Sequence, residues 1–134
     1  MQPVLKPPMQ NQRSAPVFLN LLRIRFPVGA VTSIAHRLSG LLLFLSLPVL
    51  VYWLDLSLRD PAGYADAREW LQCGWVRLAS VVIVWSLVHH LFAGLRFLLI
   101  DLGLGVERTA ARRSAWTVNG LALLLVLVYI GWIV

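Results

Sequence analysis

The sequence predicts an all-α integral membrane protein with three transmembrane helices in a single domain, residues 1–134. Hydrophobic residues make up 59% of the chain and charged residues only 13%, about half the charged share of a soluble domain. The apolar residues gather in long runs, each close to the roughly 20 residues that cross a bilayer as a helix. Six Trp residues fit the water–lipid interface, where this side chain is enriched.

The first expected span covers residues 27–54. Pro27 suits the first helical position, because its missing N–H would have no intrahelical partner there. Pro48 predicts a kink within this span, which neighbouring helices can accommodate. The other two spans are expected at residues 78–100 and 116–134.

The basic residues indicate the orientation of the spans. Four precede the first span and three separate the second from the third, against three between the first and second and none after the third. Cytoplasmic segments carry the excess of Lys and Arg, so residues 1–26 are expected in the cytoplasm and the C-terminus in the periplasm. The net charge of +6 is therefore attributed to topology and not to nucleic-acid binding.

A polar cluster lies near the start of the first span. Ser33 and Arg37 are four residues apart and share a helix face, and His36 precedes Gly40 by four residues. An arginine at the centre of a span costs about 2.5–3.5 kcal/mol, unless its side chain reaches the polar boundary. We expect these four residues to face another helix, another subunit or a ligand, because lipid would not solvate them.

The second span contains His89 and His90, which point about 100° apart on a helix and so cannot serve one site. His90 shares a stripe with Ser86 and Gly94, and the small neighbours would let a flat macrocycle approach. Haem iron accepts a neutral imidazole, and the absence of Cys-x-x-Cys-His predicts that any haem is non-covalent haem b. An interhelical hydrogen bond is the alternative role for either histidine.

The second haem ligand is expected from another chain. Counted from the helix ends, His36 should lie closer to the cytoplasm than His90, too far away to face it across one ring. Arg96 and Asp101, near the cytoplasmic end of the second span, either bind haem propionates or simply mark the helix end. The single cysteine, Cys73, cannot hold an iron–sulfur cluster on its own.

The two polar clusters resemble a known signature. Ser-x-x-His-Arg-x-Ser-Gly in the first span and His-x-x-x-Gly-x-Arg-x-x-x-x-Asp in the second are similar to the cytochrome b556 subunits of succinate dehydrogenase, respiratory complex II. The resemblance covers nearly the whole chain, including Arg23-Ile24-Arg25-Phe26-Pro27. It implies an anchor in the bacterial inner membrane that pairs with a second, smaller anchor subunit. A flavoprotein and an iron–sulfur subunit would dock on the cytoplasmic side.

The resemblance also implies residue roles. One haem b would lie between one histidine from each anchor, with His90 as the axial ligand and metal-binding residue. His36 and Arg37 would approach the propionates, and Ser33 and Arg37 would line the ubiquinone site. Phe97 stands where many relatives have histidine, which leaves His90 as the only match to the axial position. His89 is assigned to packing.

Two other functions remain open at this point. One alternative is a fumarate reductase anchor that uses menaquinol. Some such anchors lack haem, and the stripe of small residues around His90 argues against these. A small transporter or channel subunit is the other, with Arg37, Arg96 and His90 along a polar pathway. No acidic residue lies within an expected span to support such a pathway. The chain is not expected to be catalytic alone, because it has no flavin motif and no cluster cysteines.

Overall fold

The structure is a computed structural model that describes residues 26–134. Its helices are α1 (Val28–Arg59), α2 (Pro61–Gln72), α3 (Gly74–Asp101) and α4 (Arg108–Ile133). Three of them, α1, α3 and α4, are long and apolar enough to cross a membrane. The prediction of an all-helical membrane protein with three spans is therefore confirmed. The four basic residues counted before the first span lie outside the described residues.

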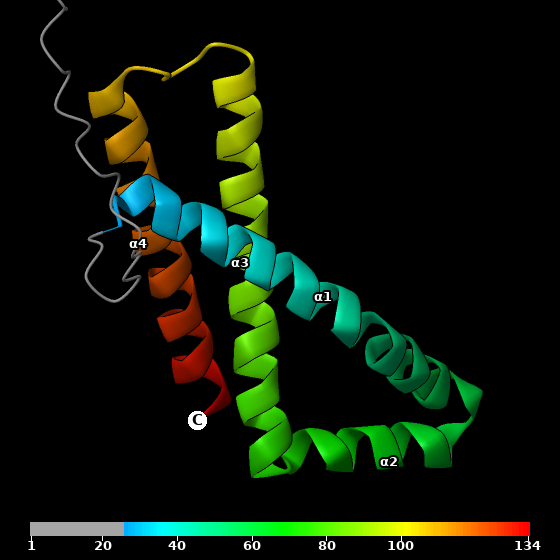
Figure 1. Cartoon of the computed structure of the whole chain (residues 1–134). Helices are drawn as coiled ribbons and strands as arrows, with labels where there is room; N and C mark the ends of the chain where they lie inside the picture. The colour runs from blue at the N-terminus through cyan, green and yellow to red at the C-terminus, as the bar shows by residue number, and fades with distance from the viewer. Residues whose placement is uncertain (1–25) are drawn as a thin grey trace, which may run out of the picture.

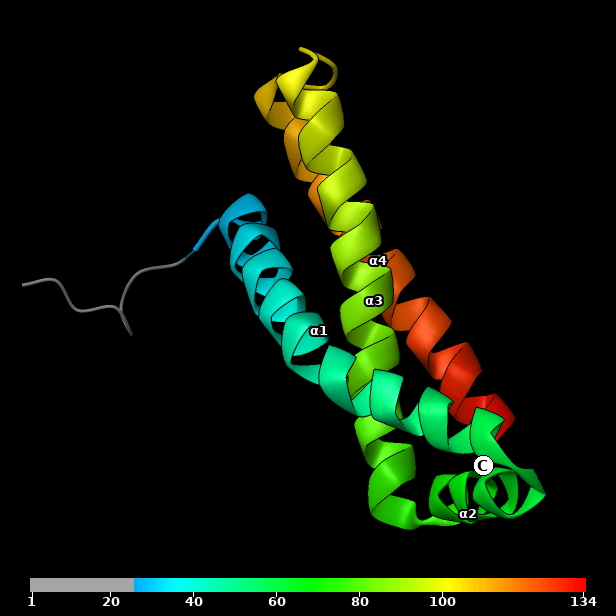
Figure 2. The same cartoon turned by 90° about the vertical axis from the view of Figure 1, so that its right-hand side faces the viewer.

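Each long helix extends beyond the apolar run that predicted it. α1 ends at Arg59, α3 begins at Gly74 and α4 begins at Arg108, because a helix satisfies its own backbone and can continue past the hydrocarbon. α1 also continues through Pro48. Figure 2 shows its axis changing direction between the cyan and green parts, as a proline within a helix predicts.

The segment between the first two spans, for which no helix was predicted, folds as the helix α2. Asp60 is its N-cap, and Asp60 Oδ1 accepts a hydrogen bond from the N–H of Gly63 at 2.7 Å. Pro61 occupies the first turn, a favoured place for proline. A Cβ on Gly63 would lie 2.4 Å from the carbonyl oxygen of Leu56, so the corner between α1 and α2 requires glycine.

The helices are not arranged as a parallel bundle. α3 and α4 run side by side, while α1 crosses them obliquely and diverges from α3 along its second half (Figures 1 and 2). α2 returns from the end of α1 to the start of α3 and completes a triangle (Figure 1). α1 begins short of the end of α3, with Gly29 near Arg96, so that the last turns of α3 project beyond it (Figure 1).

Small side chains and polar contacts join the spans. Ala93, Ala115 and Ala122 are buried and allow close helix approach, as is usual inside a membrane. Asn119 Nδ2 donates to Thr32 Oγ1 at 2.9 Å, and the Tyr129 hydroxyl donates to Ser80 Oγ at 2.9 Å. Such interhelical hydrogen bonds contribute about 0.6 kcal/mol each on average.

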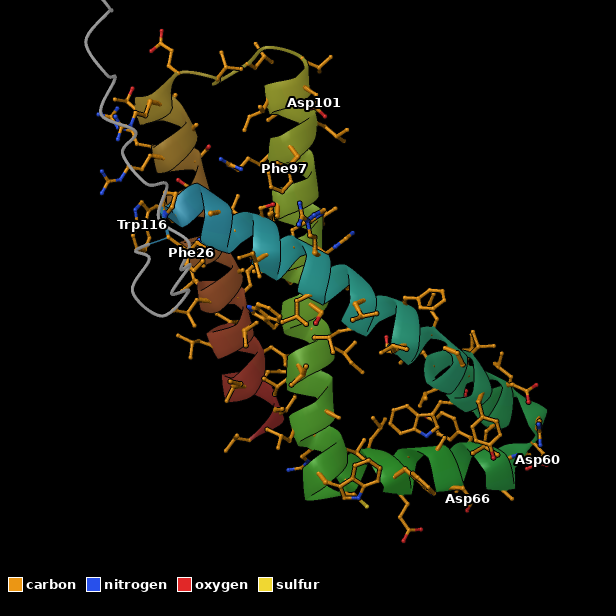
Figure 3. The ribbon with its side chains drawn as sticks, viewed as in Figure 1. Phe26, Asp60, Asp66, Phe97, Asp101 and Trp116 are labelled. Atoms are coloured by element: carbon orange, nitrogen blue, oxygen red, sulfur yellow. The ribbon has the colours of Figure 1, made fainter. Side chains whose placement is uncertain are left out.

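Arg96 is buried and does not extend to the surface of this chain. Its side chain is 8% exposed. Its Nε donates to Ser114 Oγ and one terminal nitrogen to the carbonyl of Ala111, both at 3.0 Å. Arg96 therefore joins α3 to the start of α4. Asp101 is exposed and ends α3 (Figure 3), which agrees with one of the two roles left open for it.

The turn after α3 is closed by a Schellman motif. The N–H of Gly103 donates to the carbonyl of Ile100, and the N–H of Leu104 donates to that of Leu99, both at 2.9 Å. Gly103 has φ +81°, a left-handed conformation that glycine adopts without steric cost. This turn brings the chain back so that α4 begins beside the end of α3.

Candidate functional site

The candidate site is the crossing of α1 and α3, where His36 and His90 meet. Their rings are stacked, with centroids 4.2 Å apart and planes 9° from parallel. Each histidine also lies against a glycine of the opposite helix. A Cβ on Gly40 would lie 2.9 Å from Cε1 of His90, and a Cβ on Gly94 would lie 3.4 Å from Nε2 of His36.

The contact is reciprocal because both helices carry His-x-x-x-Gly, at His36 and Gly40 on α1 and at His90 and Gly94 on α3. Residues four apart lie on one helix face. On each helix the imidazole is therefore followed, one turn later, by a glycine. Because the two helices are antiparallel, each imidazole lies against the glycine of the other helix. The absence of a Cβ at Gly40 makes room for the His90 ring, whereas a Cβ at Gly94 would meet His36 at an ordinary contact distance.

The expected difference in depth between His36 and His90 is wrong. That expectation counted residues from the helix ends and assumed that α1 and α3 end at one level. α1 instead begins short of the end of α3, where a Cβ on Gly29 would lie 4.0 Å from a terminal nitrogen of Arg96, and it then crosses the middle of α3 (Figure 1). His36 therefore lies level with His90. The stripe of small residues on α3 was predicted to let a macrocycle approach. In the structure His36 lies against Gly94 of this stripe.

Hydrogen bonding fixes the state of the His90 ring. Its Nδ1 lies 3.1 Å from the carbonyl oxygen of His36 and 3.4 Å from Ser39 Oγ. A carbonyl can only accept, so Nδ1 carries the proton and donates it to this oxygen. Ser39 is fully buried and donates to the same carbonyl at 2.8 Å. In the neutral tautomer that donates through Nδ1, the lone pair lies on Nε2 of His90.

His89 has different surroundings from its neighbour. It is 2% exposed and stacks on Trp85, with centroids 5.3 Å apart and planes at 19°. Its Nε2 is buried and has no hydrogen-bond partner among the described residues. His90, in contrast, is half-buried. The His89 ring is therefore buried with one nitrogen unpaired among the described residues, and the packing role expected for it stays a prediction.

The polar residues near the start of α1 face two ways. His36 and Gly40 lie against α3, whereas the Arg37 side chain is exposed and Ser33 is half-buried. The structure therefore brings His36 and His90 together but leaves Arg37 on the surface of this chain. Phe97 packs edge-on against His36, with centroids 5.3 Å apart, in the place where the resemblance would put a histidine.

The donor set fits a haem bound at His90. Among the described residues no group of three or more His, Cys, Asp or Glu could hold a metal ion, but haem iron needs only axial ligands. His90 offers a neutral ring with its lone pair on Nε2 and its Nδ1–H held by a carbonyl, an arrangement typical of metal-binding histidines. Because the rings of His36 and His90 are stacked face to face, they cannot approach one iron from opposite sides.

Sequence reasoning missed one residue of this site, Ser39, which lies beside His90 Nδ1. Gly40 was expected to face another helix, and the structure shows that it makes room for the His90 ring. The repeated His-x-x-x-Gly pattern was visible in the sequence and would have identified the helix pair, because its halves complement each other.

We expect Gly40→Ala to destabilise the crossing. The new methyl group would lie 2.9 Å from His90 Cε1, and overpacking of this kind costs about 1–3 kcal/mol. Thermal unfolding of the protein in detergent would measure the loss. The matched control is Gly120→Ala on α4, where a Cβ meets nothing within 4 Å. Equal destabilisation by both substitutions would show that the contact with His90 is not the cause.

Comparison with known proteins places the chain among membrane anchors. A family model described as "Succinate dehydrogenase/Fumarate reductase transmembrane subunit" matches residues 9–129. The succinate dehydrogenase cytochrome b556 subunit of Coxiella burnetii is 34% identical over 119 residues, covering 88% of this chain and 95% of the relative. The corresponding subunit of Paracoccus denitrificans is 32% identical over 108 residues, covering 78% and 81%. That of Rickettsia felis is 27% identical over 120 residues, covering 90% and 92%.

Proposed function

The chain belongs to the family of succinate dehydrogenase/fumarate reductase transmembrane subunits, and from this premise we propose that it holds haem b and helps to form the ubiquinone site of a succinate:ubiquinone oxidoreductase. It is a membrane-spanning cytochrome b subunit of succinate dehydrogenase, as its relatives are named. The observation that carries the haem proposal is the His90 ring, whose Nδ1 is held by the carbonyl of His36 at 3.1 Å.

His90 is the axial ligand in this proposal. The carbonyl of His36 fixes the tautomer and the ring orientation, and Ser39 and Gly40 shape the space around the ring. Bound haem b supplies a centre that accepts and returns one electron at a time. The second ligand is a histidine of the smaller anchor subunit, because the stacked rings of His36 and His90 cannot coordinate one iron from opposite faces.

His36 and Arg37 are proposed to contact the haem propionates, and Ser33 and Arg37 the quinone. Arg37 is exposed and Ser33 half-buried in the isolated chain, so both are accessible to a ligand between subunits. A quinone oxygen gains negative charge as electrons arrive. The Ser33 hydroxyl can donate to such an oxygen, and the Arg37 guanidinium stabilises the charge in a preorganised way.

The remaining partners follow from this assignment. We propose that the iron–sulfur and flavoprotein subunits dock at the cytoplasmic end, where α1 begins and α3 ends. The excess of basic residues at this end supports an N-terminus in the cytoplasm and a C-terminus in the periplasm. The membrane is then the bacterial inner membrane. The names of the relatives favour succinate dehydrogenase over a menaquinol fumarate reductase.

A reduced-minus-oxidised optical spectrum tests the proposal. The chain would be affinity-tagged, solubilised gently and purified with its partners. We expect a bis-imidazole b-type spectrum that is reducible by succinate and co-elutes with a flavoprotein. A flat spectrum with a flavoprotein present would indicate a haem-free anchor, and a flat spectrum without soluble partners would contradict the assignment to complex II.

A further inference from the structure

A basic pocket lies apart from the histidine crossing, in the corner where α1 begins against α3 and α4. Its volume is about 500 Å³. Three arginines line it, Arg96 from α3 and Arg108 and Arg112 from α4, and none of His36, Arg37 and His90 does. Arg96 is 8% exposed, so one of the three positive charges is buried within the wall of the pocket.

This chain does not neutralise the pocket. Among residues 26–134 the only ion pair joins Arg59 to Asp55, at the far end of α1. The sequence before Asp55 contains no acidic residue, so the N-terminal segment cannot supply a carboxylate either. Arg108 and Arg112 are exposed, and Arg96 donates to Ser114 and to the carbonyl of Ala111. None of the three has a carboxylate partner among residues 26–134, so their combined positive charge favours an anionic ligand.

The start of α1 adds donors to the same pocket. Val28 and Gly29 line it, and the first N–H groups of a helix have no intrahelical acceptor. Pro27, at the N-cap, provides no side-chain hydrogen bond to them. The positive end of the helix dipole therefore adds to the field of the arginines. Guanidinium and backbone N–H groups together suit the oxygens of a phosphate.

The walls of the pocket distinguish a lipid from a soluble anion. Phe26 and Trp116 line the pocket and are 48% and 61% exposed, and Figure 3 shows them at the start of α1 beside α4. Aromatic side chains of this kind gather at the level of lipid headgroups. Arg96 lies five residues before the end of α3, about 8 Å along the helix, which is close to the polar boundary.

We propose that this pocket binds the phosphate of an anionic phospholipid, with Arg96, Arg108 and Arg112 around the phosphate and Phe26 and Trp116 beside its acyl chains. The site is separate from the haem and quinone sites proposed above and does not depend on them. The pocket would bind one lipid of the surrounding bilayer where α1, α3 and α4 meet.

The test compares neighbouring arginines of α4. Phosphatidylglycerol with a fluorescent acyl chain would be titrated into the purified complex in detergent micelles, with phosphatidylcholine as the neutral lipid. Arg112→Gln removes a charge from the pocket, whereas Arg113→Gln removes an equal charge from the same turn outside it. We expect Arg112→Gln to weaken phosphatidylglycerol binding about fivefold and Arg113→Gln by less than about twofold.

Four results would overturn the proposal. Equal weakening by both substitutions would mean that general surface charge attracts the lipid. Binding of phosphatidylcholine with the same affinity would remove the need for an anion. Displacement of the lipid by millimolar inorganic phosphate would assign the pocket to a soluble anion. The absence of saturable binding to the unsubstituted complex would mean that a partner subunit fills the pocket.

Discussion

Replacing His90 with alanine is expected to remove the b-type haem spectrum from the purified complex. The substitution deletes the imidazole whose Nδ1 is held by the carbonyl of His36 and whose Nε2 is proposed to bind the haem iron. A remaining ligand from the partner subunit would leave at most a five-coordinate, altered haem. The complex itself is expected to assemble, because Asn119, Tyr129 and Arg96 still join the helices.

The measurement is the reduced-minus-oxidised spectrum, with haem quantified per flavin. The neighbouring His89 provides the matched control, since His89→Phe keeps a ring stacked on Trp85 and is expected to retain the six-coordinate spectrum. A full low-spin spectrum in His90→Ala would contradict the assignment of the ligand. Loss of the spectrum in His89→Phe alone would transfer the assignment to His89.

Replacing Arg37 with alanine is expected to lower succinate-driven ubiquinone reduction by about 10²-fold or more, the effect of losing one donor that stabilises a developing negative charge. Reduction of a soluble artificial dye by succinate should stay largely intact, because the dye accepts electrons before they reach the quinone site. Arg37 is exposed in this chain, so its removal leaves no buried cavity. The two activities would be measured on the same purified complex.

Arg37→Lys separates charge from geometry. The ammonium keeps the positive charge but lacks the planar, two-pronged donor arrangement of guanidinium, so partial ubiquinone reductase activity is expected. Equal loss of the quinone and dye activities in Arg37→Ala would show that Arg37 acts through assembly of the complex. Unchanged ubiquinone reduction would exclude Arg37 from the quinone site.

The sequence predicted the spans because membrane helices must be both long and apolar. Each of the three expected runs lies almost entirely within a long helix, and Asp101 ends α3, which is one of the two roles left open for it. α2 escaped notice because its composition is polar on average, although Asp60 and Pro61 form a recognisable helix start. An N-cap aspartate followed by proline is a local signal and would have identified this helix.

The relative placement of the helices was not predictable in the same way. Nothing local in α1 indicates that it begins near Arg96, short of the end of α3, so counting from helix ends placed His36 at the wrong depth. Arg96 illustrates the same limit, because its partners Ser114 and Ala111 lie across a turn. The polar residues could be singled out from the sequence because placing them in a membrane costs free energy. Their hydrogen-bond partners could not, because these depend on the tertiary structure.

The triangle of α1, α2 and α3 (Figure 1) has a mechanical consequence. Because the three helices are joined at each corner, their relative angles can change only if a helix bends or the packing at a corner changes. α2 has 12 residues and is therefore about 18 Å long. The close approach of Gly63 to Leu56 restricts movement at the corner between α1 and α2. The length of α2 therefore helps to set the angle at which α1 leaves α3, and so how widely the two helices separate away from the imidazole pair.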